Sequence, residues 1–246
     1  MRNIKLIIEY DGKDFNGWQK QPNKLNIQGT VEKAIEQITG EKVNLMASGR
    51  TDRGVHALGQ VANFKTNSNI PIDKFAIAIN SNLKKSILIE SAEEVDEKFH
   101  SRLACKKKTY RYIINNSKCG TALYRNLETH IPNRLDIKKM QEGIKHFEGE
   151  HDFKAFKASG TSSKSSIRKI YKAEVKKMPD DRIWIELTGN GFLYNMVRII
   201  AGTLVDVGLG KILPDEIPSI IESEKRENAG KTLQPQGLYL VNVEYD

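Results

Sequence analysis

One aspartate, Asp52, lies between two arginines, Arg50 and Arg53, and glycines at positions 49 and 54 flank all three. A guanidinium close to a carboxylate stabilises the ionised form and lowers its pKa. An ionised aspartate can act as a nucleophile, an electrostatic stabiliser or a metal ligand. Because the motif contains no second carboxylate to share a metal, it favours a nucleophile. The alternative is an aspartate that forms a turn, with ordinary salt-bridge partners.

The two arginines of this segment suggest a further role. The planar fork of a guanidinium matches the oxygens of a phosphate group. Arg50 is therefore a candidate substrate-binding residue, and Arg53 is a second candidate for contact with a phosphate. One short segment combines a candidate nucleophile with groups that can hold a phosphate.

Two tyrosines, Tyr110 and Tyr112, follow the three lysines at positions 106–108. Side chains alternate along a strand, so both tyrosines point to the same face. The pair is typical of a hydrophobic core. The alternative is a platform on which a nucleic-acid base stacks, and the neighbouring lysines favour it slightly.

A second arginine of interest, Arg198, lies in the most apolar helical segment of the chain, NMVRIIAGTLVDVG. A buried or half-buried arginine needs a carboxylate or phosphate partner. Asp52 is one candidate partner, and Asp206 within the same half of the chain is the alternative.

The chain is basic, with a net charge of +8 over 246 residues. Residues 1–104 carry 15 Lys and Arg against 13 Asp and Glu, whereas residues 105–246 carry 24 against 18. The stretch 154–177 holds eight basic residues and one acidic residue, and its Ser/Gly-rich middle, Ala158–Ser166, is predicted to be mobile. These charges indicate a polyanionic partner, for example one with a phosphate backbone. The alternative is a solvated loop followed by a charged strand.

Several classes of site and protein are disfavoured. The two cysteines, Cys105 and Cys119, have no metal-binding spacing, and the five histidines are scattered, so we expect free thiols and no metal site. GTSSKS at 160–165 lacks the glycines of a phosphate-binding loop. No apolar run reaches the roughly 18 residues of a membrane span, and the N-terminus does not resemble a signal peptide. We expect a soluble cytoplasmic protein without membrane contact.

The expected elements repeat one order, β-α-β-β-α-β, in both halves. Helices are expected where apolar residues recur at helical spacing, and strands where short apolar runs alternate or stand between turn residues. The expected strands are Ile4–Tyr10, Val43–Ala47, Gln60–Phe64, Ile87–Ser91, Thr109–Ile114, Ile167–Val175, Ile183–Leu187 and Leu238–Tyr245. The expected helices run from Val31 to Gly40, Ile72 to Leu83, Asp136 to Phe147, Leu193 to Gly208, and near Ile217–Ile221.

This order predicts an α+β fold of two ferredoxin-like halves, residues 1–104 and 105–246, around a mainly antiparallel sheet. We expect the first half to carry the Asp52 loop. The second half is expected to complete a cleft between the halves and to supply an RNA-binding surface.

Longer blocks of the sequence resemble the tRNA pseudouridine synthase A family. The resemblance covers nearly the whole chain in order. The matching blocks are YDGKDFNGWQKQPNKLNIQGTVEKAI (10–35), GRTDRGVHALGQVANF (49–64), KKTYRYII (107–114), GEHDF (149–153), GFLYNMVRIIAGTLVDVG (191–208) and QGLYLVNVEY (236–245).

The resemblance implies an enzyme that isomerises uridine to pseudouridine in the anticodon stem-loop of tRNA, at positions 38 to 40. It implies that Asp52 is the nucleophile, that Tyr110 packs against the target base, and that Arg198 pairs with the catalytic aspartate. It also implies a homodimer that needs no metal and no cofactor.

The sequence departs from the family pattern at three places. Arg53 stands where many members have a small residue, and Ser101 and Leu103 replace the usual neighbours of Arg102. Residues 233–235 replace a more usual Ala-Pro-containing stretch. None of these changes removes a residue assigned to chemistry.

Two other classes of function remain as alternatives. An RNA-binding module without catalysis accounts for the charge and the topology, but not for an aspartate between arginines. A phosphotransferase that uses Asp52 as a phosphorylated nucleophile requires a magnesium site and nearby acidic ligands, and the sequence shows neither.

Overall fold

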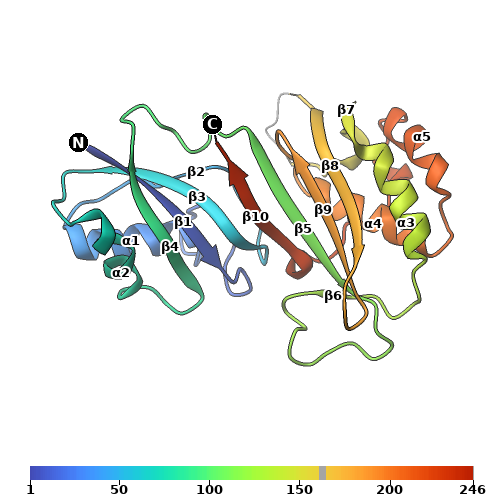
Figure 1. The fold of residues 1–246 in the computed structure, drawn as a ribbon, viewed down its shortest axis with the longest axis horizontal. Coiled ribbons are helices and arrows are strands. Elements are labelled where there is room, and N and C mark those ends of the chain that lie inside the picture. Colours follow the sequence, from blue (N-terminus) through green and yellow to red (C-terminus); the bar gives the residue numbers. More distant parts are fainter. Residues whose placement is uncertain (161–164, 246) are drawn as a thin grey trace. The chain divides into compact units, whose positions relative to one another are not determined.

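The computed structural model describes residues 1–160 and 165–245 (Figure 1). The chain forms two compact units. Unit 1 contains Met1–Lys106 and the C-terminal residues from Tyr239 onward, and unit 2 contains Lys107–Leu238. The boundary near residue 106 lies close to the expected one, but the last strand, β10 (Leu238–Glu244), belongs mainly to unit 1 instead of the second half.

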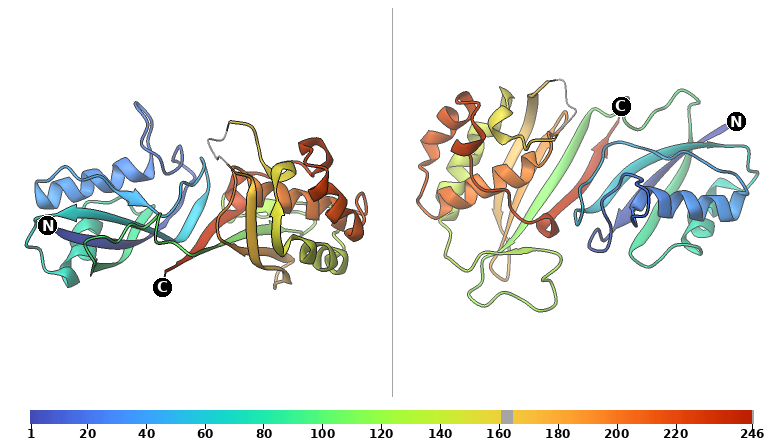
Figure 2. Two further views of the ribbon diagram at one scale, coloured as in Figure 1. Left: turned by 90° about the horizontal axis from the view of Figure 1, so that it is seen from above. Right: turned by 180° about the vertical axis from the view of Figure 1, so that it is seen from behind.

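Unit 1 has the predicted ferredoxin-like order. Its elements are β1 (Arg2–Tyr10), α1 (Ile27–Thr39), β2 (Met46–Ala47), β3 (His56–Thr66), α2 (Ile72–Asn80) and β4 (Ile87–Val95). The strands lie in the order β4-β1-β3-β2, and every neighbouring pair is antiparallel. Both helices cover one face of this sheet (Figure 2). This arrangement confirms the fold expected for the first half.

The core of unit 1 follows from the alternation of the sequence. Ile4, Leu6 and Ile8 point inward from β1 and are fully buried, as are Val31 and Ile35 of α1. Helix α1 ends where the sequence predicts, because Gly40 adopts a left-handed conformation with φ 73°.

β10 joins unit 1 through β3. Tyr239 lies opposite His56 and Leu240 opposite Ala57 in a parallel pairing. β2 pairs with the same edge of β3 further along, opposite Ala62 and Asn63. Two short strands therefore share one edge of β3, which periodicity along the chain does not reveal.

Unit 2 is also an α+β unit with antiparallel main strands. Its elements are β5 (Lys107–Asn115), β6 (Thr129–His130), α3 (Ile137–Gly143), a 3₁₀ helix (Ile144–Phe147), β7 (Gly149–Asp152), a 3₁₀ helix (Lys154–Phe156), β8 (Ile167–Lys177), β9 (Arg182–Gly189), α4 (Met196–Gly208), a 3₁₀ helix (Pro214–Glu216), α5 (Ile217–Glu222), and 3₁₀ helices at Arg226–Asn228 and Pro235–Gly237. The strands lie in the order β5-β9-β8-β7 with antiparallel neighbours, and β6 pairs in parallel with β5.

The helices of unit 2 begin at recognisable signals. Asp136 caps α3, because its side chain accepts a hydrogen bond from the Lys139 amide at 3.2 Å. Helix α4 begins at Met196 and not at Leu193, because Asn195 adopts a left-handed conformation with φ 60°.

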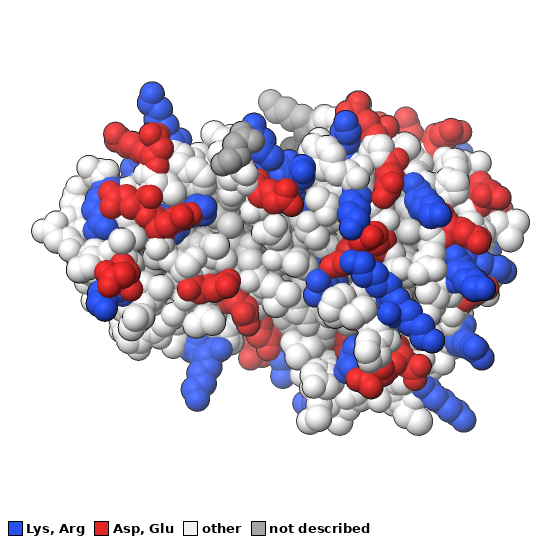
Figure 3. Space-filling model, viewed as in Figure 1, with Lys and Arg blue, Asp and Glu red and all other residues white. Residues whose placement is uncertain are grey.

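The basic stretch 154–177 divides into two parts. Residues 161–164, in the middle of the predicted mobile segment, lie outside the described residues. Lys172 and Lys176 of β8 form ion pairs with Glu174 and Glu186 at 2.7 and 2.6 Å, respectively. Figure 3 shows basic and acidic side chains interspersed on this face of unit 2. The described part of the stretch from residue 167 is therefore a charged strand.

Candidate active site

Asp52 lies in the loop that joins β2 to β3 in unit 1, and its side chain is half-buried. The loop is fixed at both ends. The Ser48 amide donates to the Val61 carbonyl at 2.8 Å, and Gln60 Nε2 donates to the Gly49 carbonyl at 2.9 Å. The Val55 amide closes the following turn by donating to the Asp52 carbonyl at 3.1 Å. These bonds give Asp52 a defined backbone position.

The residue before the aspartate, Thr51, is held from two sides. The Tyr10 hydroxyl lies 2.7 Å from Thr51 Oγ1, and the Trp18 amide donates to the Thr51 carbonyl at 3.0 Å. Burial raises the pKa of Tyr10 to about 12. The contacts join the residue beside Asp52 to segments 41 and 33 positions earlier in the sequence.

Two glycines of the first sequence block allow these contacts. A Cβ atom on Gly17, whose φ is 82°, would lie 2.5 Å from the Thr51 carbonyl oxygen. A Cβ atom on Gly12 would lie 2.0 Å from the Val55 carbonyl oxygen. Real Cβ atoms do not approach backbone this closely, so only glycine fits. The glycines of YDG and GW are thus explained by the close approach of the Asp52 loop.

Arg50 and Arg53 are both exposed. Within residues 1–160 and 165–245, neither arginine forms an ion pair. Their guanidinium groups are accessible to an anionic ligand, which fits the expected phosphate contacts.

The two tyrosines of β5 have different environments. Tyr112 is fully buried, and its hydroxyl contacts Thr129 Oγ1 at 2.6 Å and donates to the Gln234 carbonyl at 2.7 Å. Burial raises its pKa above the ordinary value. Tyr110 is 8% exposed and meets the Phe192 ring edge-on, with centroids 5.0 Å apart. Tyr112 is therefore a core residue, and Tyr110 remains the candidate for contact with a base.

Arg198 lies in the first turn of α4 and is half-buried. Its Nε donates to the Leu233 carbonyl at 2.7 Å, and its Nη1 donates to Asn195 Oδ1 at 2.6 Å. Both acceptors lie in the same unit as Arg198, whereas Asp206 pairs with Lys211 at 3.1 Å. Two fixed acceptors thus orient the planar guanidinium of Arg198.

Several supporting residues were not identified from the sequence. In unit 1, Tyr10 binds Thr51 and Gln60 binds the Gly49 carbonyl, so both fix the loop beside Asp52; in unit 2, Asn195 binds Arg198 directly. Leu233 acts through its carbonyl oxygen, so its contact does not depend on the side chain that departs from the family pattern. Among these positions, only the glycines around Asp52 signalled unusual backbone in the sequence.

The structure places Asp52 and Arg50 in unit 1, and Tyr110 and Arg198 in unit 2. In the described part of the chain, no three His, Cys, Asp or Glu side chains come together in a way that would hold a metal ion. Cys105 and Cys119 do not form a disulfide. Among the described residues, no helix has the length and apolar character required to cross a membrane.

The sequence of the chain is similar to those of known proteins along its whole length. The profile of the tRNA pseudouridine synthase family matches residues 6–103 and 144–246, which include Asp52 and Arg198. Over 245 residues, the chain is 54%, 55% and 43% identical to proteins named tRNA pseudouridine synthase A from Acetivibrio thermocellus, Caldicellulosiruptor bescii and Brevibacillus brevis, respectively. Each alignment covers 100% of both chains.

The chain therefore belongs to the tRNA pseudouridine synthase family. It is an isomerase that converts uridine in tRNA to pseudouridine, and the resemblance found in the sequence is confirmed.

Proposed function

We propose that the chain acts on uridines 38 to 40 in the anticodon stem-loop of tRNA, and that Asp52 is the nucleophile. The observation that carries this proposal is the Asp52 loop itself. A half-buried carboxylate is placed on a backbone that hydrogen bonds fix at Gly49, Thr51 and Val55. Such preorganisation is what a nucleophile needs to meet its target in a reactive geometry.

The reaction balances without an added reagent. The bond between N1 of the base and C1′ of the sugar breaks, and a bond between C5 and C1′ forms. C5 loses its proton and N1 gains one, so no net oxidation occurs. An ionised Asp52 can attack the base, attack the sugar carbon, or assist deprotonation of the sugar to a glycal. The target base must first leave its stack, which costs a few kcal/mol.

Two residues of unit 2 are proposed to act together with Asp52. Tyr110 contacts the target base, and Arg198 supplies positive charge to the reacting groups. The edge-on contact with Phe192 supports a fixed ring orientation for Tyr110, and two acceptors orient Arg198. Aromatic stacking with a base contributes roughly 1–3 kcal/mol, which offsets part of the cost of unstacking.

Tritium release tests the choice of substrate. Each tRNA transcript would carry tritium at C5 of a single uridine, at position 38, 39 or 40 of the anticodon stem-loop. The enzyme would be assayed in the presence of a chelator. We expect release from these positions and none from a transcript labelled only in another arm. Release confined to another arm would contradict the proposed positions, and release that requires added metal would contradict the metal-free reaction.

The exposed arginines of the Asp52 loop are expected to bind RNA phosphates. The double variant Arg50→Ala/Arg53→Ala should weaken tRNA binding at low salt. It should also reduce the slope of log K against log salt by roughly 0.7–0.9 for each phosphate that the protein no longer neutralises. Binding measured at several salt concentrations checks this, with the exposed Lys33→Ala on α1 as the control. An unchanged affinity and slope would show that neither arginine binds RNA.

We further propose that the protein is a homodimer in the cytoplasm. The resemblance to the family supports the dimer. Sedimentation equilibrium tests this proposal, because a single species with the mass of one chain, 27.9 kDa, would contradict it.

A further inference from the structure

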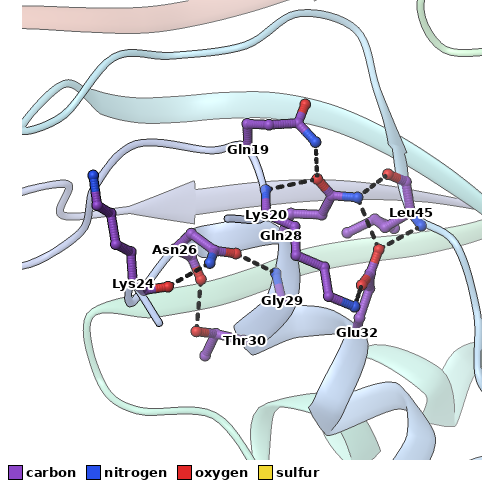
Figure 4. A network of polar contacts seen from close by, with 9 residues as sticks. All are labelled: Gln19, Lys20, Lys24, Asn26, Gln28, Gly29, Thr30, Glu32 and Leu45. Carbon is purple, nitrogen blue, oxygen red and sulfur yellow. Dashed lines mark hydrogen bonds and ion pairs between the residues drawn. The ribbon is translucent and has the colours of Figure 1, made fainter. Parts of the chain in front are cut away.

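Glu32 is a buried carboxylate on α1 that the proposed chemistry does not use. Its side chain is 8% exposed, although charged side chains are seldom this buried. Oε1 accepts hydrogen bonds from Gln28 Nε2 at 2.9 Å and from the Leu45 amide at 3.0 Å. Oε2 accepts from Lys20 Nζ at 2.9 Å. Figure 4 shows this carboxylate between three segments of unit 1.

Gln28, one turn earlier on the same helix, extends the network. Its Oε1 accepts from Gln19 Nε2 and from the Lys20 amide, both at 3.2 Å. Its Nε2 donates to Glu32 and, at 3.3 Å, to the Leu45 carbonyl. Glu32 therefore fixes which way the Gln28 amide faces (Figure 4).

The first segment held by this network leads into the Asp52 loop from the N-terminal side. Strand β2 pairs with β3 only through Met46 and Ala47. Leu45, just before it, has its amide bound by Glu32 and its carbonyl bound by Gln28. Two helix side chains thus supply the hydrogen bonds that a neighbouring strand supplies elsewhere in a sheet.

The second segment, residues 17–20, contacts the Asp52 loop. The backbone amides of Ile27 and Gln28 donate to the carbonyls of Gly17 and Trp18 at 3.2 and 3.0 Å. The Trp18 amide in turn donates to Thr51. The backbone of α1 thus holds residues 17 and 18, and the side chains of Gln28 and Glu32 bind the end of the same segment at Lys20.

We propose that Glu32 is a positioning residue for the isomerisation. By orienting Gln28 and binding Leu45, it holds the two segments that place Asp52. This inference rests on the proposed role of Asp52. Glu32 acts through hydrogen-bond acceptance, because its charged partner Lys20 has a side chain that is 65% exposed and solvent screens such a pair.

The test compares variants that keep or remove the acceptor. Glu32→Gln keeps an oxygen at Oε1 and should retain kcat within about threefold of the wild type. Glu32→Leu should lower kcat on the order of 10- to 100-fold, as small misplacements of reacting groups do. KM for tRNA should change little. Glu36→Leu, one turn further along α1, is the matched control and should leave kcat unchanged.

Hydrogen exchange supplies a readout independent of turnover. In Glu32→Leu, peptides that contain the Trp18 and Val55 amides should exchange faster than in the wild type, and in Glu36→Leu they should not. If Glu32→Leu does not fold, Gln28→Met removes the bonds that Gln28 makes with Glu32, the Leu45 carbonyl and the Lys20 amide, and it should also lower kcat and speed exchange in these peptides.

Two results would overturn the inference: wild-type kcat in Glu32→Leu, or equal losses in Glu32→Gln and Glu32→Leu. Asp52→Ala measured in parallel separates the two proposals. An active Asp52→Ala enzyme removes the role of Asp52 and with it this inference. An inactive Asp52→Ala enzyme beside a fully active Glu32→Leu enzyme removes only the role of Glu32.

Discussion

Replacing Asp52 with alanine is expected to lower the rate of pseudouridine formation by a factor on the order of 10⁴ or more, with little change in tRNA affinity. Removal of a nucleophile leaves only the contributions of binding and electrostatics, and losses of this size are typical. Asp52→Asn should be equally inactive, because it keeps the shape of the side chain and removes the charge. Single-turnover tritium release gives the rate, and filter binding gives the dissociation constant.

Asp14→Ala is a suitable control for this experiment, because Asp14 is an exposed aspartate of the same unit. It should behave as the wild type. A parallel loss of binding and turnover in Asp52→Ala would show that the aspartate is structural or binds RNA. A rate within tenfold of the wild type would assign the chemistry to another group.

The second large effect is expected at Arg198. Arg198→Lys should lower kcat on the order of 100-fold while the protein stays folded. Lysine keeps the charge, but its single ammonium group cannot reproduce the planar contacts with Leu233 and Asn195 that orient the guanidinium. Steady-state kinetics and a thermal unfolding curve would separate the effect on kcat from an effect on stability.

Arg134→Lys in unit 2 is the matched control, because Arg134 is exposed. It should leave kcat unchanged. If Arg198→Lys also retains kcat within threefold of the wild type, then positive charge alone suffices at this position, and the orientation of the fork has no role.

Local signals predicted much of the fold. Gly40 and Asp136 mark a helix end and a helix start where the sequence places them. Leu83 was expected in the second helix, but α2 ends at Asn80, and the apolar spacing continues into a turn. Strands β6 and β7 were missed, because each is held by pairing with a distant strand and has only two or four residues.

The candidate catalytic residues could be predicted from the sequence, but the residues that hold them in place could not. Asp52 and Arg198 stood out because charged residues lay in Gly-rich or apolar surroundings. The bonds from Tyr10, Trp18 and Glu32 join segments distant in sequence, and only tertiary structure brings them together. A buried glutamate within a helical pattern resembles an ordinary polar residue until its partners are known.

The role of Asp52 is tested most directly by nucleoside analysis of one tRNA after incubation with the wild type or with Asp52→Asn, without added metal or cofactor. Digestion and chromatography separate pseudouridine from uridine, which has the same mass. We expect one pseudouridine for each target uridine with the wild type, and none with Asp52→Asn over the same time, although both proteins bind the tRNA. Pseudouridine formed at comparable rates by both proteins would contradict the central role of Asp52.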